Sequence, residues 1–451
     1  MSESVLNKRV DAIRRLARRG AVAALSKVVA TTRAEDLAAT MGHLARNEQR
    51  LVFSQIRSDA VAADVLVRVG NEDFLALVNE LPVERLVRLF SEMEADDQTD
   101  LIELLPEEKQ QAVLARLHGD EREQMEELLG YASDSAGGIM SPLAFRLQEA
   151  TTCRDAIAAV QEASDHELVY YVYVENDGGQ LVGVISLRNL LTHPPSTRLA
   201  DIMTTDVITV EAHTDQEEVA RIAGRYDLLA VPVVDEHRKL LGIVTVDDVI
   251  DVIREEAAED MLLMAGVGDD NPDGVSGNRI GTAARRLPWL LVALGGGVVI
   301  SEIMGRFDGM LKVEVVLAAF IPLLIGMSGN VGIQSATLTV RNIAIGRLDT
   351  GVAARVGAEA ITGLLLGVVF SLVIGVYSYV RYGDLHTALA IGIALSCNTT
   401  AAALMGTLVP LTLRRFGVDP AIATGPFVTT GMDVVGVTVY LSIASLLLSM
   451  W

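Results

Sequence analysis

The chain has 451 residues, with 37 Lys or Arg against 59 Asp or Glu, and a formal net charge of −22 at pH 7. That length exceeds what one hydrophobic core supports and predicts about two to four domains. The acidic excess argues against nucleic acid as a partner, because binding phosphate groups needs the opposite sign, and it favours cations.

The acidic excess is confined to one half of the chain. Residues from Asn271 onward hold nine acids and eleven bases, whereas the first 270 residues hold fifty acids and twenty-six bases. We therefore expect a multidomain membrane protein, in which an acidic soluble part precedes a nearly neutral, apolar part.

Residues 1–133 are predicted to form an all-α N-domain, because apolar side chains recur in them at helical spacing. Two segments look related: LPVERLVRLF from Leu81 and LPEEKQQAVLARL from Leu105 stand 24 residues apart. In both, a Pro at the start of a helix is followed by Glu, which the positive end of the helix dipole favours. Such a repeat predicts short stacked helical hairpins, that is, a superhelix.

An acidic cluster follows the first of these repeats, in and after a turn. Its members are Glu92, Glu94, Asp96, Asp97 and Asp100. Their density is typical of a solvated loop rich in helix-capping residues.

Residues 134–246 change to an α/β pattern. Short β-branched runs typical of buried strands occur at 168–175, 181–187, 231–234 and 240–246, with helical patterns between them. The pattern repeats: IMS at Ile139 answers IMT at Ile202, and LVGVISLRNLL at Leu181 answers LLGIVTVDDVI at Leu240. Two such units resemble a tandem pair of cystathionine-β-synthase-type (CBS) domains.

Pairs of this type usually bind an adenosine nucleotide such as ATP in their cleft. The resemblance implies that a hydroxyl residue after the last strand, and an acid three residues later, hold the ribose. The second unit has Thr245 and Asp248 there, and the first has Ser186 and Asn189, with Arg188 between them. The Asn departs from the usual acid, and ordinary helix capping is the alternative role of these residues.

Residues 247–280 are predicted to form an acidic helix followed by a linker. On a helix, the acids of DDVIDVIREEAAEDM (Asp247–Met261) fill most of the polar surface, and Arg254 is the only base. Like charges four residues apart destabilise a helix, so a cation is expected to offset them. Carboxylate clusters suit Mg²⁺ and Ca²⁺, which take oxygen ligands. The turn-rich segment GVGDDNPDGVSGN follows as the linker.

Residues 281–451 contain apolar segments of membrane length, which predict an all-α transmembrane domain with five helices. The five segments are Leu287–Met304, Val315–Val340, Ala360–Val380, Thr387–Leu413 and Phe427–Met450. If the soluble part is cytoplasmic, the inner segments carry eight Arg and the outer ones two Arg and one Lys. This bias places the N-terminal part in the cytoplasm and the C-terminus outside a cell membrane.

Polar residues interrupt three of these spans. The second contains GMSGNVGIQSAT, the fourth contains SCNTT, and the fifth contains Asp433 with no Lys, Arg or His after Arg415. A carboxylate at mid-span costs about 2.5–3.5 kcal/mol, so it indicates a functional site. We interpret Asp433 as facing a cation path, and a neutral acid bonded to Asn or Thr as the alternative.

Over nearly its whole length the chain resembles the MgtE-type magnesium transporters and channels. GNVGIQSATL at Gly329 is similar to the Gly-Asn-x-Gly-x-Gln-Ser segment of that family, and DPAIATGPFVTTGMDVVG at Asp419 is similar to its fifth-span motif. The resemblance implies a homodimer in the lipid bilayer with one central Mg²⁺ pore, no enzymatic activity, and closure by cytosolic Mg²⁺.

The resemblance also implies roles for individual residues. Asp433 and Asn330 take the pore positions, and Asp96 and Asp97 are the N-domain candidates for Mg²⁺ ligands. The sensor positions of the second CBS unit, the acidic helix (the "plug" of the family) and the membrane domain are Glu217, Gly224 (through its backbone carbonyl), Asp227, Asp248, Asp251, Glu256, Glu259, Asp260 and Asp419.

Three other functions compete with a channel. An intramembrane aspartyl protease needs two apposed carboxylates, whereas Asp433 is alone at mid-span. A CBS-controlled receptor without transport does not explain the polar residues within the spans. A secondary divalent-cation exchanger coupled to H⁺ or Na⁺ is the serious alternative.

Overall fold

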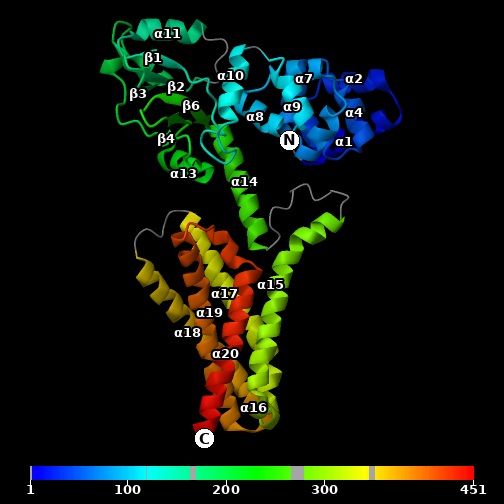
Figure 1. Ribbon diagram of the computed structural model, residues 1–451, viewed down its shortest axis with the longest axis vertical. Coiled ribbons are helices and arrows are strands. Elements are labelled where there is room, and N and C mark those ends of the chain that lie inside the picture. Colours follow the sequence, from blue (N-terminus) through cyan, green and yellow to red (C-terminus); the bar gives the residue numbers. More distant parts are fainter. Residues whose placement is uncertain (1–2, 118, 163–168, 266–278, 345–350, 451) are drawn as a thin grey trace. The chain divides into compact units, whose positions relative to one another are not determined.

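The structure, a computed structural model, describes residues 3–117, 119–162, 169–265, 279–344 and 351–450 (Figure 1). The chain divides into two compact units, Met1–Arg254 and Glu255–Trp451. The predicted linker at 266–278 and the predicted strand residue Leu168 lie outside the described residues.

The first unit begins with the helices that the sequence predicts. They are α1 (Glu3–Arg18), α2 (Val22–Ala30), α3 (Ala34–Met41), α4 (Arg46–Phe53), α5 (Asp59–Arg68), α6 (Asn71–Val78), α7 (Val83–Phe90), α8 (Ala95–Glu103), α9 (Glu107–Leu114) and α10 (Gly119–Leu128). Contacts join helices two apart in the chain, for example α3 with α5, α5 with α7 and α7 with α9. This repeating pattern is the stacking of a superhelix, and one continuous apolar core runs through it.

The acidic cluster after α7 differs from the solvated loop that the sequence indicates. Asp96, Asp97 and Asp100 lie on α8, and the Asp96 residue is only 7% exposed. Thr99 and Ile102, three and six residues after Asp96, share its buried face. The loop interpretation was wrong because the acids in the first turn of α8 stabilise a helix start through its dipole.

The tandem CBS fold is confirmed by two small sheets of the same topology. Their strands are β1 (Arg146–Gln148), β2 (Tyr171–Glu175) and β3 (Leu181–Ser186), then β4 (Val210–Glu211), β5 (Ala230–Val234) and β6 (Leu240–Thr245). In each sheet the first pair is parallel and the second antiparallel. The helices of this part are α11 (Cys153–Glu162), α12 (Leu187–Thr192), the 3₁₀ turn η1 (Leu199–Asp201) and α13 (Gln216–Tyr226).

The acidic segment forms the predicted helix, α14 (Val246–Met264), which begins in the first unit and ends in the second. Five helices of the second unit are long and apolar enough to cross a membrane. They are α15 (Arg279–Arg306), α17 (Val315–Ala344), α18 (Val352–Tyr382), α19 (Leu385–Arg415) and α20 (Pro426–Met450), with α16 (Asp308–Val313) and the 3₁₀ turn η2 (Pro420–Thr424) between them.

Helix α19 is the centre of the membrane-spanning part, since it contacts α17, α18 and α20, whereas α15 packs mainly on α20 (Figure 1). The helices approach closely at small residues. A Cβ added to Gly406 of α19 would lie 2.3 Å from the backbone oxygen of Gly332 on α17. Only glycine permits that approach, which brings the polar segments of α17, α19 and α20 together.

Candidate cation sites

The first candidate site lies where the N-domain packs on the second CBS unit. Ala95, the first residue of α8, packs against the apolar core that holds Val249 and Val252 of α14. The same contact brings Glu94 and Asp97 close to Asp247 and Asp248 at the start of α14. We call these four residues the interdomain acid cluster.

The pKa values in this cluster are raised because its carboxylates lose water and face one another. Burial raises the pKa of Asp97 to about 7, and the charges of Glu94 and Asp248 add to the effect. Burial also raises the pKa of Glu94, with Asp248 and Asp247 contributing. Burial raises the pKa of Asp248 although Thr245 hydrogen-bonds to it. The charged cluster is therefore strained, and a proton or a cation relieves it.

Thr245 fixes the orientation of two of these carboxylates. Its backbone N–H donates to Asp248 Oδ2 at 3.1 Å, and its hydroxyl Oγ1 lies 2.5 Å from both Asp248 Oδ2 and Asp247 Oδ1. This is a helix cap, so capping explains the Thr245 and Asp248 pair without a nucleotide.

Mg²⁺ binding at the cluster is expected to release protons. At pH 7, Asp97 is about half protonated in the absence of metal, because its pKa is about 7. A bound cation displaces that proton, so about half a proton per site should be released at pH 7 and almost none at pH 9. The apparent Mg²⁺ affinity should fall as the pH is lowered from 8 to 6.

Calorimetry of the full-length protein, in buffers of different ionisation enthalpy, measures this release. Asp97→Asn should remove it, and Glu103→Gln, an exposed acid on the same helix, should leave it unchanged. Equal release from wild type and Asp97→Asn would contradict the assignment.

A second group of acids lies within the second unit. Burial raises the pKa of Asp260 on α14 to about 6, and the charges of Asp419 and Glu256 add to it. Asp419 caps η2, since its Oδ1 accepts from the N–H of Ala421 at 2.7 Å. Glu259, on the same helix, is exposed.

The remaining predicted sensor residues are spread over the surface of the first unit. Glu217 and Gly224 are exposed on α13, and Asp227 is its left-handed C-cap at φ +53°. Asp251 pairs with Arg254 at 3.0 Å. Among the residues that the structure describes, no group of three or more His, Cys, Asp or Glu is arranged to hold a metal ion.

The third candidate is Asp433, on the face of α20 that meets α17. It is half-buried, and its Oδ1 is buried without a hydrogen-bond partner in the described chain. A Cβ added to Gly329 of α17 would lie 4.0 Å from this Oδ1. Asn330, the next residue, is exposed. The carboxylate thus has no protein cation beside it in the described residues, and the polar face of α17 adjoins it.

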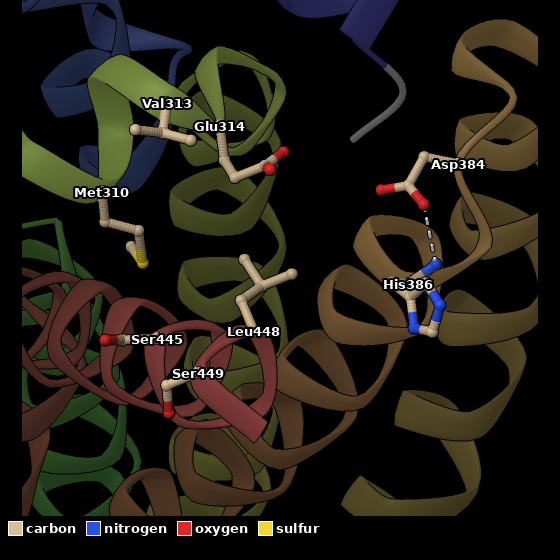
Figure 2. Close-up of a pocket in the computed structure, with 8 residues that line it drawn as sticks. All are labelled: Met310, Val313, Glu314, Asp384, His386, Ser445, Leu448 and Ser449. Carbon is tan, nitrogen blue, oxygen red and sulfur yellow. Dashed lines mark hydrogen bonds between the residues drawn. The ribbon is translucent and has the colours of Figure 1, made fainter. Parts of the chain in front are cut away.

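A hollow of about 440 Å³ lies at the end of the membrane-spanning helices where α20 finishes (Figure 2). Glu314, Asp384 and His386 line it, together with Ser445 and Ser449 of α20. The hydroxyl of buried Thr387 lies between the two carboxylates. It donates to Glu314 Oε2 at 3.2 Å and also to Asp384 Oδ2. This end of the helices therefore carries two carboxylates beside the hollow.

The predicted nucleotide residues occupy a helix start. Ser186 Oγ accepts from the N–H of Asn189 at 3.2 Å and caps α12, while Arg188 and Asn189 are exposed. These side chains are accessible to a ligand, but their contacts are those of an ordinary cap. The sequence prediction also missed two members of the interdomain acid cluster, Glu94 and Asp247. It recognised the polar run SCNTT without singling out Asn398, which lies beside Gly436 of α20.

Family models match three parts of the chain. A divalent cation transporter family, MgtE, matches residues 321–443, the MgtE intracellular N domain matches residues 32–134, and the CBS domain matches residues 199–255. These three segments cover most of α17 to α20, the N-domain superhelix from α3 onward, and the second CBS unit.

Individual proteins match over longer stretches. The magnesium transporter MgtE of Thermus thermophilus is 37% identical, over 95% of this chain and 96% of its own length. That of Bacillus subtilis is 32% identical, over 95% of both chains. The crystal structure of the cytosolic domain of the Mg²⁺ channel MgtE in complex with ATP has a TM-score of 0.51 and 35% identity, and covers 54% of this chain and 99% of that one.

Proposed function

The chain belongs to the MgtE family of magnesium transporters, which are not enzymes, and on that premise we propose that it is a channel conducting Mg²⁺ into the cell. We propose further that it closes when cytosolic Mg²⁺ binds its acidic soluble part. The observation that carries the first proposal is Asp433: a carboxylate with a buried, unpartnered oxygen on a membrane-spanning helix.

The hydration of Mg²⁺ explains why one carboxylate suffices per chain. Mg²⁺ is small and loses water reluctantly, so a pore that removed all its waters would conduct slowly. In a homodimer, two Asp433 side chains across the two-fold axis hold the largely hydrated ion through its waters, and Asn330 on the exposed face of α17 assists.

The orientation proposed for the chain rests on the charge bias of the loops, which puts the soluble part in the cytoplasm. In that orientation the hollow beside Glu314 and Asp384 faces the outside. Its negative charge raises the local concentration of cations at the outer end. The description of the matching N domain as intracellular supports the same orientation.

The proposed gating depends on the electrostatic repulsion within the interdomain acid cluster. With little Mg²⁺, the carboxylates of the interdomain acid cluster repel, which favours separation of the N-domain from α14. Bound Mg²⁺ neutralises them and favours the compact state, in which α14 blocks the pore near Asp260 and Asp419. ATP in the CBS cleft, near Ser186, Arg188 and Asn189, adjusts this balance. The ATP complex of the similar cytosolic domain supports nucleotide binding, but the position is proposed from the sequence.

Electrophysiology of the purified protein tests both parts of the proposal. Single-channel Mg²⁺ currents should follow the electrochemical gradient and cease when Mg²⁺ on the side of the soluble part is raised. Transport without unitary currents, and dependent on a gradient of H⁺ or Na⁺, would support a secondary exchanger instead.

A further inference from the structure

Two buried polar atoms lack partners in the membrane-spanning part. Asn398 of α19 is only 1% exposed, and neither its Nδ2 nor Asp433 Oδ1 has a hydrogen-bond partner in the described chain. Buried polar groups are nearly always bonded, to protein or to ordered water. One atom is a donor and the other an acceptor, so each offers what the other lacks.

Both atoms belong to one junction of three helices. A Cβ added to Gly436 of α20 would lie 2.7 Å from Asn398 Oδ1 and 3.3 Å from Ser328 Oγ on α17. The neighbour of Ser328, Gly329, faces Asp433 in the same way, at 4.0 Å. Asp433 and Gly436 are three residues apart on α20, so they share a face. Asn398 therefore lies about one helical turn from Asp433.

The other hydroxyls at this junction are already used. Ser328 Oγ donates to the Leu324 carbonyl at 2.9 Å, and Thr399 Oγ1 donates to the Leu395 carbonyl at 2.8 Å. Both bonds remain within one helix. The Asn398 amide is thus a buried side-chain donor there whose Nδ2 has no partner among the residues that the structure describes.

We propose that Asn398 is a positioning residue for Asp433. Its amide donates, through one ordered water, to the inner carboxylate oxygen Oδ1, so that the outer oxygen faces the ion path. One helical turn is a rise of about 5 Å, which fits a bridging water better than a direct bond. Glycine at 436 permits the close approach of the Asn398 amide, because a Cβ there would lie 2.7 Å from Asn398 Oδ1. This inference rests on the proposed function, because it assumes that Asp433 meets the ion.

The test compares unitary Mg²⁺ currents of Asn398→Leu and Asn398→Ser, in full-length protein in lipid bilayers. Losing a hydrogen bond to a carboxylate should raise the half-saturating Mg²⁺ concentration about tenfold in the Leu variant. The Ser variant keeps a donor and has room for one more water, so it should lie between Leu and wild type. Thr399→Val, an isosteric change of the adjacent buried residue, should match wild type.

Unitary currents separate positioning from a purely structural role, because a folding defect lowers the number of channels and not the half-saturating concentration. If both Asn398 variants keep the wild-type half-saturation, the inference is overturned; the smaller Ser side chain carries the test where the Leu variant does not assemble. If Asp433→Ala itself conducts normally, the proposed function fails, which is a separate result.

Discussion

Asp433→Ala is expected to reduce Mg²⁺ flux into proteoliposomes to below about one-hundredth of the wild-type rate. Removing one member of a close charge contact costs about 2–5 kcal/mol, which corresponds to thirtyfold or more. In the proposed dimer both carboxylates are lost together, so the hydrated ion has no anion at the Asp433 position. The fluorescence of a Mg²⁺-sensitive dye enclosed in liposomes, which contain equal amounts of folded protein, measures the Mg²⁺ flux.

Two further variants show whether charge at that position is responsible. Asp433→Asn keeps the shape and loses the charge, so it should be as inactive as the Ala variant. Glu302→Gln removes an exposed acid from another span, α15, and should conduct normally. Wild-type flux through Asp433→Ala would exclude this carboxylate from the ion path.

Neutralising Asp248, Asp251 and Glu259 together is expected to give a channel that stays open at high internal Mg²⁺. Asp248 belongs to the interdomain acid cluster, and the other two lie along α14. Without these charges, the compact state binds Mg²⁺ only slightly more tightly than the separated state, so Mg²⁺ no longer favours closure. The Mg²⁺ concentration that closes the channel should rise by about tenfold or more, since charge-assisted contacts contribute about 1.5–3 kcal/mol each.

The matched control removes three exposed acids elsewhere in the CBS pair, Glu162, Asp201 and Asp206. It changes the net charge by the same amount and should close at the wild-type concentration. Patch-clamp recording, while internal Mg²⁺ is stepped, compares the two triple variants. Wild-type closure of the α14 variant would place the sensor elsewhere.

The local pattern was sufficient to predict most of the fold, but not the start of α8 or the short strands β1 and β4. Repeated strand runs gave the two sheets, and apolar length gave the five spans. One segment is more helical than its glycine content indicates, because α17 remains a continuous helix through GMSGNVGIQSAT. Glycines weaken a helix in water by about 1 kcal/mol each. Within a bilayer the backbone groups have no water to bond instead, so the helix persists.

The convergence of acids from distant segments was not predictable from the sequence. Glu94 and Asp248 are far apart in the chain, and their proximity depends on how α8 docks through Ala95 on the second CBS core. Likewise, the SCNTT run was recognised as polar, but its relation to Asp433 depends on glycine contacts between three helices. Such contacts depend on tertiary packing, which the spacing of apolar residues in the sequence does not predict.

The hydrogen bonds of Thr245 affect the affinity that the interdomain acid cluster would have for a cation. A free side chain that must be ordered by a ligand costs the complex conformational entropy, about 1 kcal/mol for a flexible acid. Asp248 is held by the Thr245 N–H and hydroxyl, so folding has already ordered it. Glu94 has a longer side chain, and no hydrogen bond or ion pair among the described residues holds its carboxylate in this way. Under the proposed gating, the ion meets one preorganised acid and one that it must order. The cost of ordering the second raises the Mg²⁺ concentration needed for closure.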